Sequence, residues 1–109
     1  MTQDRLGSGF VGVARLEELP PGTSKIIWID NRTVALFNVN GTVYATDNNC
    51  PHSGGPLGKG TLDGEVVTCP WHMWEFNVRT GINVFSPDER IETYPVIVRN
   101  GRILVKLPA

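Results

Sequence analysis

The stretch CPHSGGPLGKGTLDGEVVTCPWH, residues 50–72, decides what this chain can be. It begins with Cys50 and His52 and ends with Cys69 and His72. The chain has 109 residues but two cysteines and two histidines, so these two pairs use all of them. Because thiolate and imidazole are the ligands of soft metal centres, the stretch predicts one inorganic site bound by all four side chains. A mechanism that needs a third histidine is excluded.

The spacing of the four ligands favours one kind of centre over another. Zinc accepts two cysteines and two histidines, but its usual fingers place Cys with Cys and His with His across a short helix. Here each pair is mixed, and no part of the chain shows a sustained helical period. A [2Fe–2S] cluster with two Cys on one iron and two His on the other needs two loops that each reach both irons. Glycines at 54, 55, 58 and 60 would let the first loop turn sharply and bring backbone N–H groups toward the sulfides. A zinc-binding interaction module remains the alternative.

Outside the ligand stretch, short β-branched and aromatic runs are separated by turn residues. Asn40-Gly41 and Asn100-Gly101 are strong hairpin signals, and Pro95 should lie at a strand edge or a bulge. The expected strands are Phe10–Ala14, Lys25–Ile29, Thr33–Val39, Thr42–Thr46, Glu65–Thr68, Ile91–Arg99 and Arg102–Leu107. We therefore predict an all-β protein in which residues 1–109 form one domain. Its base is a small antiparallel β-sandwich or barrel, and loops at about 49–60 and 69–76 form a cluster-binding subdomain.

Composition limits the partners and the compartment. Ten Lys and Arg against eleven Asp and Glu give a net charge of −1, which argues against binding to nucleic acid or to an anionic membrane. The first twenty residues contain no apolar run of signal-peptide length, and no later segment approaches a membrane span. We therefore expect a cytoplasmic protein. A Cys50–Cys69 disulfide is disfavoured in that compartment.

The sequence resembles the Rieske family, whose signature is Cys-x-His, a spacer of about this length, and Cys-x-x-His. The words around the ligands match as well, namely WEFNVRTG at 74–81 and Tyr94-Pro95-Val96, and the likeness extends from Phe10 to Leu107. It implies that Cys50 and Cys69 bind the buried iron of one [2Fe–2S] cluster, and that His52 and His72 bind the outer iron. It also implies a β-sandwich base with a small cluster-binding subdomain. Pro87 falls where the family has a proline-bearing loop over the cluster.

Two departures from the family pattern bear on the reduction potential. High-potential relatives join the two loops by a disulfide, but the corresponding residues here are Gly55 and Trp71. Those relatives also hydrogen-bond the cluster through Ser and Tyr hydroxyls, and the matching residues here are Trp74 and Phe76. Fewer donors stabilise the added negative charge less. We therefore predict a potential near the bottom of the roughly −150 to +300 mV Rieske range.

A third departure is Met73, which follows the last histidine where many relatives have glycine. It is interpreted either as a docking contact at the cluster tip or as a residue that packs within the loop. An apolar collar round the histidines is expected from four neighbours, Pro51, Leu57, Pro70 and Trp71, although Trp71 could instead pack inward. The charged residues after the second loop are interpreted as a solvated face with no site role. They are Glu75, Arg79, Asp88, Glu89 and Arg90.

The resemblance implies a soluble, monomeric ferredoxin that carries one electron between a reductase and a terminal aromatic-ring or hydrocarbon oxygenase. Both partners are expected to dock near His52 and His72. The chain is not expected to be an enzyme on its own, because a mononuclear iron site needs two further histidines and a carboxylate. The alternative function is the small Rieske subunit of an NAD(P)H nitrite reductase-like oxidoreductase, which is similar in size and in GGPLGKG, residues 54–60.

Overall fold

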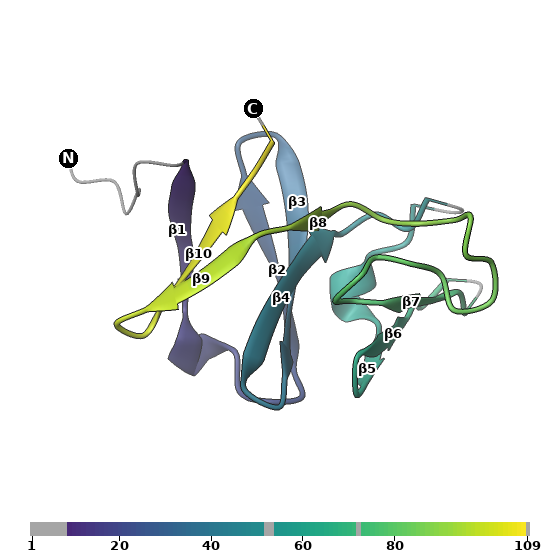
Figure 1. The fold of residues 1–109 in the computed structure, drawn as a ribbon, viewed down its shortest axis with the longest axis horizontal. Coiled ribbons are helices and arrows are strands. Elements are labelled where there is room, and N and C mark those ends of the chain that lie inside the picture. The colour runs from purple at the N-terminus through teal and green to yellow at the C-terminus, as the bar shows by residue number, and fades with distance from the viewer. Residues whose placement is uncertain (1–8, 52–53, 72, 109) are drawn as a thin grey trace.

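The computed structural model describes residues 9–51, 54–71 and 73–108, and the regular secondary structure in these ranges is almost entirely β-strand. Two short 3-10 helices, η1 and η2, interrupt the strands (Figure 1). The elements are β1 Phe10–Arg15, η1 Leu16–Glu18, β2 Ser24–Ile29, β3 Arg32–Val39, β4 Thr42–Asp47, η2 Leu57–Lys59, β5 Thr61–Asp63, β6 Val66–Thr68, β7 Glu75–Asn77, β8 Thr93–Tyr94, β9 Val96–Arg99 and β10 Arg102–Lys106.

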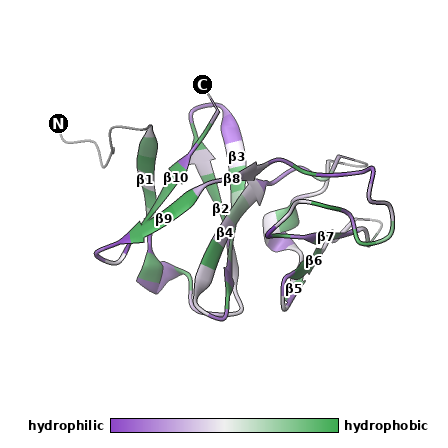
Figure 2. Cartoon of the chain, viewed as in Figure 1, coloured by the Kyte–Doolittle hydropathy of each residue, from purple (hydrophilic) through white to green (hydrophobic). Residues whose placement is uncertain are grey.

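Two antiparallel sheets form the base of the molecule. One has the strand order β1-β10-β9 and the other has the order β2-β3-β4-β8. Both predicted hairpins are present: φ is 51° at Asn40 and 98° at Gly41, and 51° at Asn100 and 75° at Gly101. Positive φ at both central residues is the geometry for which Asn-Gly is favoured. Figure 2 shows hydrophobic residues along β9 and β10 and hydrophilic ones at the turn between them.

Strand β3 has apolar side chains buried on both of its faces. Val34 and Leu36 pack into a first hydrophobic cluster between the two sheets of the base. Ala35 and Phe37 point the other way, into a second cluster that also contains Cys50 and Cys69. All four side chains are fully buried. Because side chains alternate along a strand, β3 contributes buried side chains to both hydrophobic clusters.

A third sheet, with the strand order β5-β6-β7, stands beside the base at the end away from the N-terminus (Figure 1). Its Val67 and Phe76 are paired across β6 and β7 and are both fully buried in the second cluster. The two loops that contain Cys50 and Cys69 adjoin this sheet. The predicted all-β fold, an antiparallel base with a smaller cluster-binding part, is confirmed.

The structure differs from the predicted strands on either side of Pro95. Residues 91–99 were expected to form one run, but Pro95 separates β8, which pairs with β4, from β9, which pairs with β10. Proline has no N–H to donate, and its carbonyl accepts a hydrogen bond from the Lys106 N–H at 3.1 Å. Pro95 is therefore the point at which the chain crosses from one sheet to the other.

The second loop is shorter than predicted. It was expected to run to residue 76, but β7 begins at Glu75, so the loop covers residues 69–74. The first predicted loop, 49–60, contains η2. Within the residues described, no helix is long and apolar enough to cross a membrane.

Candidate metal centre

The first loop, residues 48–60, connects β4 to β5 and closes tightly on Cys50. The Cys50 N–H donates to the Gly55 carbonyl at 2.9 Å, and the Gly54 N–H donates to the Cys50 carbonyl at 2.7 Å. Gly54 has φ +73°, a backbone conformation that glycine adopts without steric penalty. The predicted sharp turn in this glycine-rich loop is present at Gly54.

A buried asparagine holds the two ends of the first loop together. Asn48 is 5% exposed, and its Oδ1 accepts a hydrogen bond of 2.7 Å from the Gly58 N–H. Its backbone carbonyl accepts a second from the Leu57 N–H at 2.7 Å. The Ser24 hydroxyl donates to the Gly58 carbonyl at 2.8 Å and so ties η2 to β2. The sequence analysis missed Asn48, since nothing local distinguishes a buried Asn before a Cys from a turn residue.

The second loop places two large apolar side chains in solvent. The Cys69 N–H donates to the Trp74 carbonyl at 2.7 Å, which closes the turn. Between them, Trp71 is 52% exposed and Met73 is 67% exposed. Met73 has φ +60°, in the left-handed region that favours glycine. Glycine would adopt this backbone conformation without steric penalty.

The two loops approach each other at Gly55. A Cβ atom on Gly55 would lie 2.7 Å from the Cys69 Sγ and 3.1 Å from the Trp71 Cβ, so only glycine fits without a shift of its neighbours. Cys50 and Cys69 are not disulfide-bonded and are 2% and 0% exposed. Both belong to the second cluster, which also contains Phe37 and Phe76.

This arrangement fits a [2Fe–2S] cluster of the predicted kind. Two unbridged, buried thiols beneath two adjoining loops can supply two soft ligands on the side that is shielded from water. His52 and His72 lie outside the described residues, so their part in the ligand set stays a prediction. Without these two histidines, the described ranges contain no group of three or more His, Cys, Asp or Glu side chains that could hold a metal ion.

Three of the four residues predicted to form the apolar collar are exposed. Pro51, Pro70 and Trp71 are exposed, and Trp71 therefore points outward rather than into the core. The prediction for Leu57 is wrong. Its side chain is fully buried in the second cluster, because η2 packs against β2 and β3.

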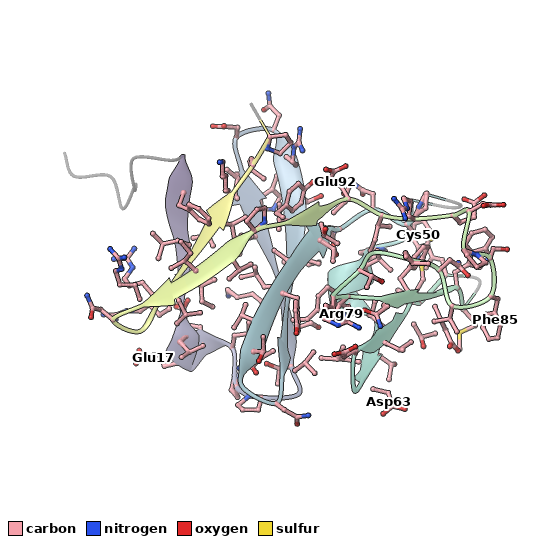
Figure 3. The ribbon with its side chains drawn as sticks, in the orientation of Figure 1. Glu17, Cys50, Asp63, Arg79, Phe85 and Glu92 are labelled. Atoms are coloured by element: carbon pink, nitrogen blue, oxygen red, sulfur yellow. The ribbon has the colours of Figure 1, made fainter. Side chains whose placement is uncertain are left out.

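A third loop, residues 83–90, adjoins the second loop and contains Pro87. Asn83 is 4% exposed, and its Oδ1 accepts hydrogen bonds from the N–H groups of Phe85 at 2.8 Å and Ser86 at 2.9 Å. The loop and the second loop share a cavity of about 250 Å³, lined by Met73, Trp74, Asn83, Phe85 and Ser86. Figure 3 shows Phe85 at the end of the molecule that also holds Cys50, far from Glu17.

Two arginines, Arg79 and Arg32, form side-chain contacts outside the two loops. The Arg79 Nε contacts the Glu65 Oε2 at 3.3 Å, and both side chains are partly exposed. On the base, the Arg32 Nη1 donates to the Tyr94 hydroxyl at 3.2 Å. Burial raises the pKa of Tyr94, although the Arg32 hydrogen bond acts in the opposite direction. Neither group belongs to the predicted ligand set.

Comparison with known proteins defines the class. The family model of the Rieske [2Fe-2S] domain matches residues 9–95, and the chain therefore belongs to the Rieske [2Fe–2S] family. The predicted cofactor, one [2Fe–2S] cluster of the Rieske type, is confirmed by this membership and by the relatives below.

Two relatives that align with most of the chain are ferredoxins. The chain is 34% identical over 99 residues to the ferredoxin component of the naphthalene 1,2-dioxygenase/salicylate 5-hydroxylase systems of Ralstonia sp, covering 90% of this chain and 95% of that protein. Among solved structures, the ferredoxin of carbazole 1,9a-dioxygenase from Nocardioides aromaticivorans IC177 has a TM-score of 0.85 at 32% identity, covering 93% of this chain and 100% of that one. The protein is therefore an electron carrier of the ferredoxin type and not an enzyme on its own, as predicted.

Two further structures bear on the partners. A complex of reduced oxygenase and oxidised ferredoxin in carbazole 1,9a-dioxygenase contains a chain with a TM-score of 0.83 and 31% identity, covering 92% of this chain and 94% of that one. The putative NADH-dependent nitrite reductase small subunit from Mycobacterium tuberculosis also has a TM-score of 0.83, at 28% identity, covering 92% of this chain and 96% of that one.

Proposed function

We propose that this chain is the ferredoxin of a multicomponent aromatic-ring or hydrocarbon oxygenase, and that it carries single electrons from a reductase to the terminal oxygenase. The observation that carries the proposal is the 34% identity to the Ralstonia ferredoxin component across 95% of that protein. In this proposal the electrons come from and go to partner proteins.

In this proposal Cys50 and Cys69 bind one iron through their thiolates, and His52 and His72 bind the other through imidazole nitrogen. The bound cluster supplies one-electron redox chemistry. The chain excludes water from the two thiols, which are 2% and 0% exposed, and Gly55 leaves room for the Cys69 Sγ. Trp71 and Met73 give the opposite side of the loops an apolar surface.

The ligand set can be tested by substitution. Cys50→Ser and Cys69→Ser should each lose most of the iron and sulfide, because the serine oxygen is a hard ligand. His52→Cys and His72→Cys should each keep a cluster but change the Rieske EPR spectrum of the reduced protein, because a thiolate replaces one of the two imidazole ligands. Full iron content with an unchanged spectrum in any of the four would contradict the assignment of that residue.

We also propose that the potential is low. Trp74 and Phe76 carry no hydroxyl, and Phe76 is fully buried among apolar side chains. Fewer hydrogen bonds to the sulfurs leave the reduced state less stabilised. Redox titration should give a midpoint near the lower end of the roughly −150 to +300 mV range. A midpoint well above zero would contradict this reasoning.

The proposed carrier is a cytoplasmic monomer whose partners dock near His52 and His72. Support comes from Trp71 and Met73, which flank position 72 and expose apolar surface there. A small, transient contact suits a carrier that must leave each partner quickly. Gel filtration should give the mass of a single chain; a stable dimer would contradict the monomer.

Electron delivery is the direct test of function. The reduced holoprotein should be mixed anaerobically with the oxidised terminal oxygenases of naphthalene, biphenyl and carbazole dioxygenases. Stopped-flow absorbance should show oxidation of the ferredoxin and reduction of at least one oxygenase. Cys69→Ser is the matched control and should transfer nothing. Absence of transfer to all three oxygenases would overturn the proposed function.

The likeness to the Mycobacterium tuberculosis subunit supports a second candidate, the small subunit of a nitrite reductase. A permanent subunit should co-purify with a large flavin-containing chain, whereas a shuttle should not. Co-expression of this chain with a nitrite reductase large subunit separates the two candidates. A stable complex with nitrite-dependent NAD(P)H oxidation would favour the subunit.

A further inference from the structure

Met73 combines an unfavourable backbone with an exposed apolar side chain. Its φ of +60° is a conformation that costs a residue with a Cβ more than it costs glycine. Its side chain is 67% exposed, so packing within the chain offers little compensation. The interpretation that Met73 packs within its own loop therefore fails, and a contact outside the chain is left.

The third loop shows a similar combination. Phe85 is 76% exposed and Val84 is 46% exposed. The backbone beneath them is fixed, because Asn83 accepts two N–H groups and the Val84 N–H donates to the Glu75 carbonyl at 2.9 Å. A mobile loop could fold these side chains inward, but this one holds them in water. Rigid, exposed apolar side chains are typical of a contact surface.

Met73 and Phe85 line the same groove. Trp74 lies with them there, and its ring is 6.3 Å from the Phe76 ring in the core. The groove volume of about 250 Å³ accommodates one large side chain. An inserted apolar side chain would therefore contact Met73, Phe85 and the edge of the second cluster together.

The charges on the elements that form the groove are mainly negative. Glu75, Asp88 and Glu89 carry three negative charges against one positive charge on Arg90. Arg79 is engaged with Glu65. Two copies of this chain would bring like charges together, which disfavours self-association here. A partner with Lys or Arg around its apolar contact complements these charges.

We infer that the groove between Met73 and Phe85 is the docking socket for a redox partner that inserts one apolar side chain from within a ring of Lys and Arg. The inference rests on the proposed function in taking the occupant to be a redox partner. Met73 and Phe85 are positioning residues of the contact, since neither belongs to the predicted ligand set.

Electron-transfer kinetics test the socket with the holoprotein and an oxygenase that the wild type reduces. Met73→Ala and Phe85→Ser should each lower the second-order rate constant at least ten-fold, with the midpoint potential and EPR spectrum unchanged. Met73→Gly should lower the rate equally while raising Tm, because glycine adopts the backbone conformation at this position without strain. Trp28→Ser removes an equally exposed aromatic side chain from β2 in the base and should change nothing. Wild-type rates in Met73→Ala and Phe85→Ser would overturn the inference and leave the proposed function intact.

A binding probe tests the groove without any oxygenase. The chain has two methionines, so selective ¹³C-methyl labelling gives one signal from Met73 and one from Met1. In the oxidised holoprotein, a short peptide with one Trp between lysines should shift the Met73 signal, and less so at high salt. The same peptide with glutamates should not. Loss of the shift in Phe85→Ser is expected. No shift with the lysine peptide, or equal shifts with both, would overturn the socket even if electron delivery succeeds.

Discussion

The two hydrophobic clusters meet at β3, but different interactions hold each region together. The base consists mainly of longer strands, and its first cluster fills the space between two sheets. The cluster-binding part has strands of three residues, and side-chain-to-backbone hydrogen bonds from Asn48 and Asn83 position its loops. The base can therefore be stable through apolar burial, whereas the cluster-binding part depends on a few specific contacts and on its cofactor.

The largest effect expected is at β3, where neighbouring residues face different regions. Leu36→Ala and Phe37→Ala should each lower the free energy of unfolding by about 2–5 kcal/mol, since each leaves a cavity in a fully buried site. Phe37→Ala should in addition lose iron, because Phe37 packs in the second hydrophobic cluster, which contains both cysteines. Urea unfolding and iron per chain provide the measurements. Equal iron content in both variants would mean that the two regions are not separated at β3.

A somewhat smaller effect is expected where the loops approach each other. Gly55→Ala should cost about 3 kcal/mol, because its Cβ would lie 2.7 Å from the Cys69 Sγ. Gly55→Ala should also change the visible circular dichroism of the [2Fe–2S] cluster. Gly41→Ala is the matched control, since its φ is +98° but nothing lies within 4 Å. It should destabilise the base hairpin and leave the cluster spectrum as it was.

The buried asparagines allow a finer comparison. Asn48→Ala leaves the Gly58 N–H without its acceptor and should cost about 1–2 kcal/mol. Asn38→Ala should cost a similar amount in the base, where Asn38 donates to the Leu19 carbonyl at 2.7 Å. Hydrogen exchange at Leu57 and Gly58 should accelerate in Asn48→Ala alone, together with faster loss of iron to a chelator. Accelerated exchange at Leu57 and Gly58 in both variants would contradict the conclusion that Asn48 holds the first loop independently of Asn38 in the base.

The smallest effect expected is a pH dependence located in the base. Burial raises the pKa of Tyr94, so the folded protein keeps the phenol proton to higher pH than the unfolded chain. The resulting stabilisation is present below about pH 10 and is lost as the pH rises through the folded pKa. Stability should therefore fall less steeply above about pH 10 in Tyr94→Phe than in the wild type. Parallel urea-unfolding curves across that range would contradict the shift.

Sequence reasoning succeeded where short-range rules apply. Alternation and Asn-Gly turns predicted most of the base, and the paired Cys and His predicted the family, the cofactor and the exposed tip. Sequence reasoning failed where tertiary contacts determine the local structure. The crossing at Pro95 depends on which strands are available to pair, and the burial of Leu57 depends on how η2 packs against β3. The backbone strain at Met73 has no local sequence signal.

The double burial of β3 also determines whether the cluster-binding part can be moved to another protein. A segment transplanted from residues 48–90 would leave behind Ala35 and Phe37, which form part of its core. The donor base would then present the apolar face of a central strand to water, a surface prone to association. The cluster-binding part is therefore not a portable module. A recipient scaffold would have to supply a strand that is apolar on both faces.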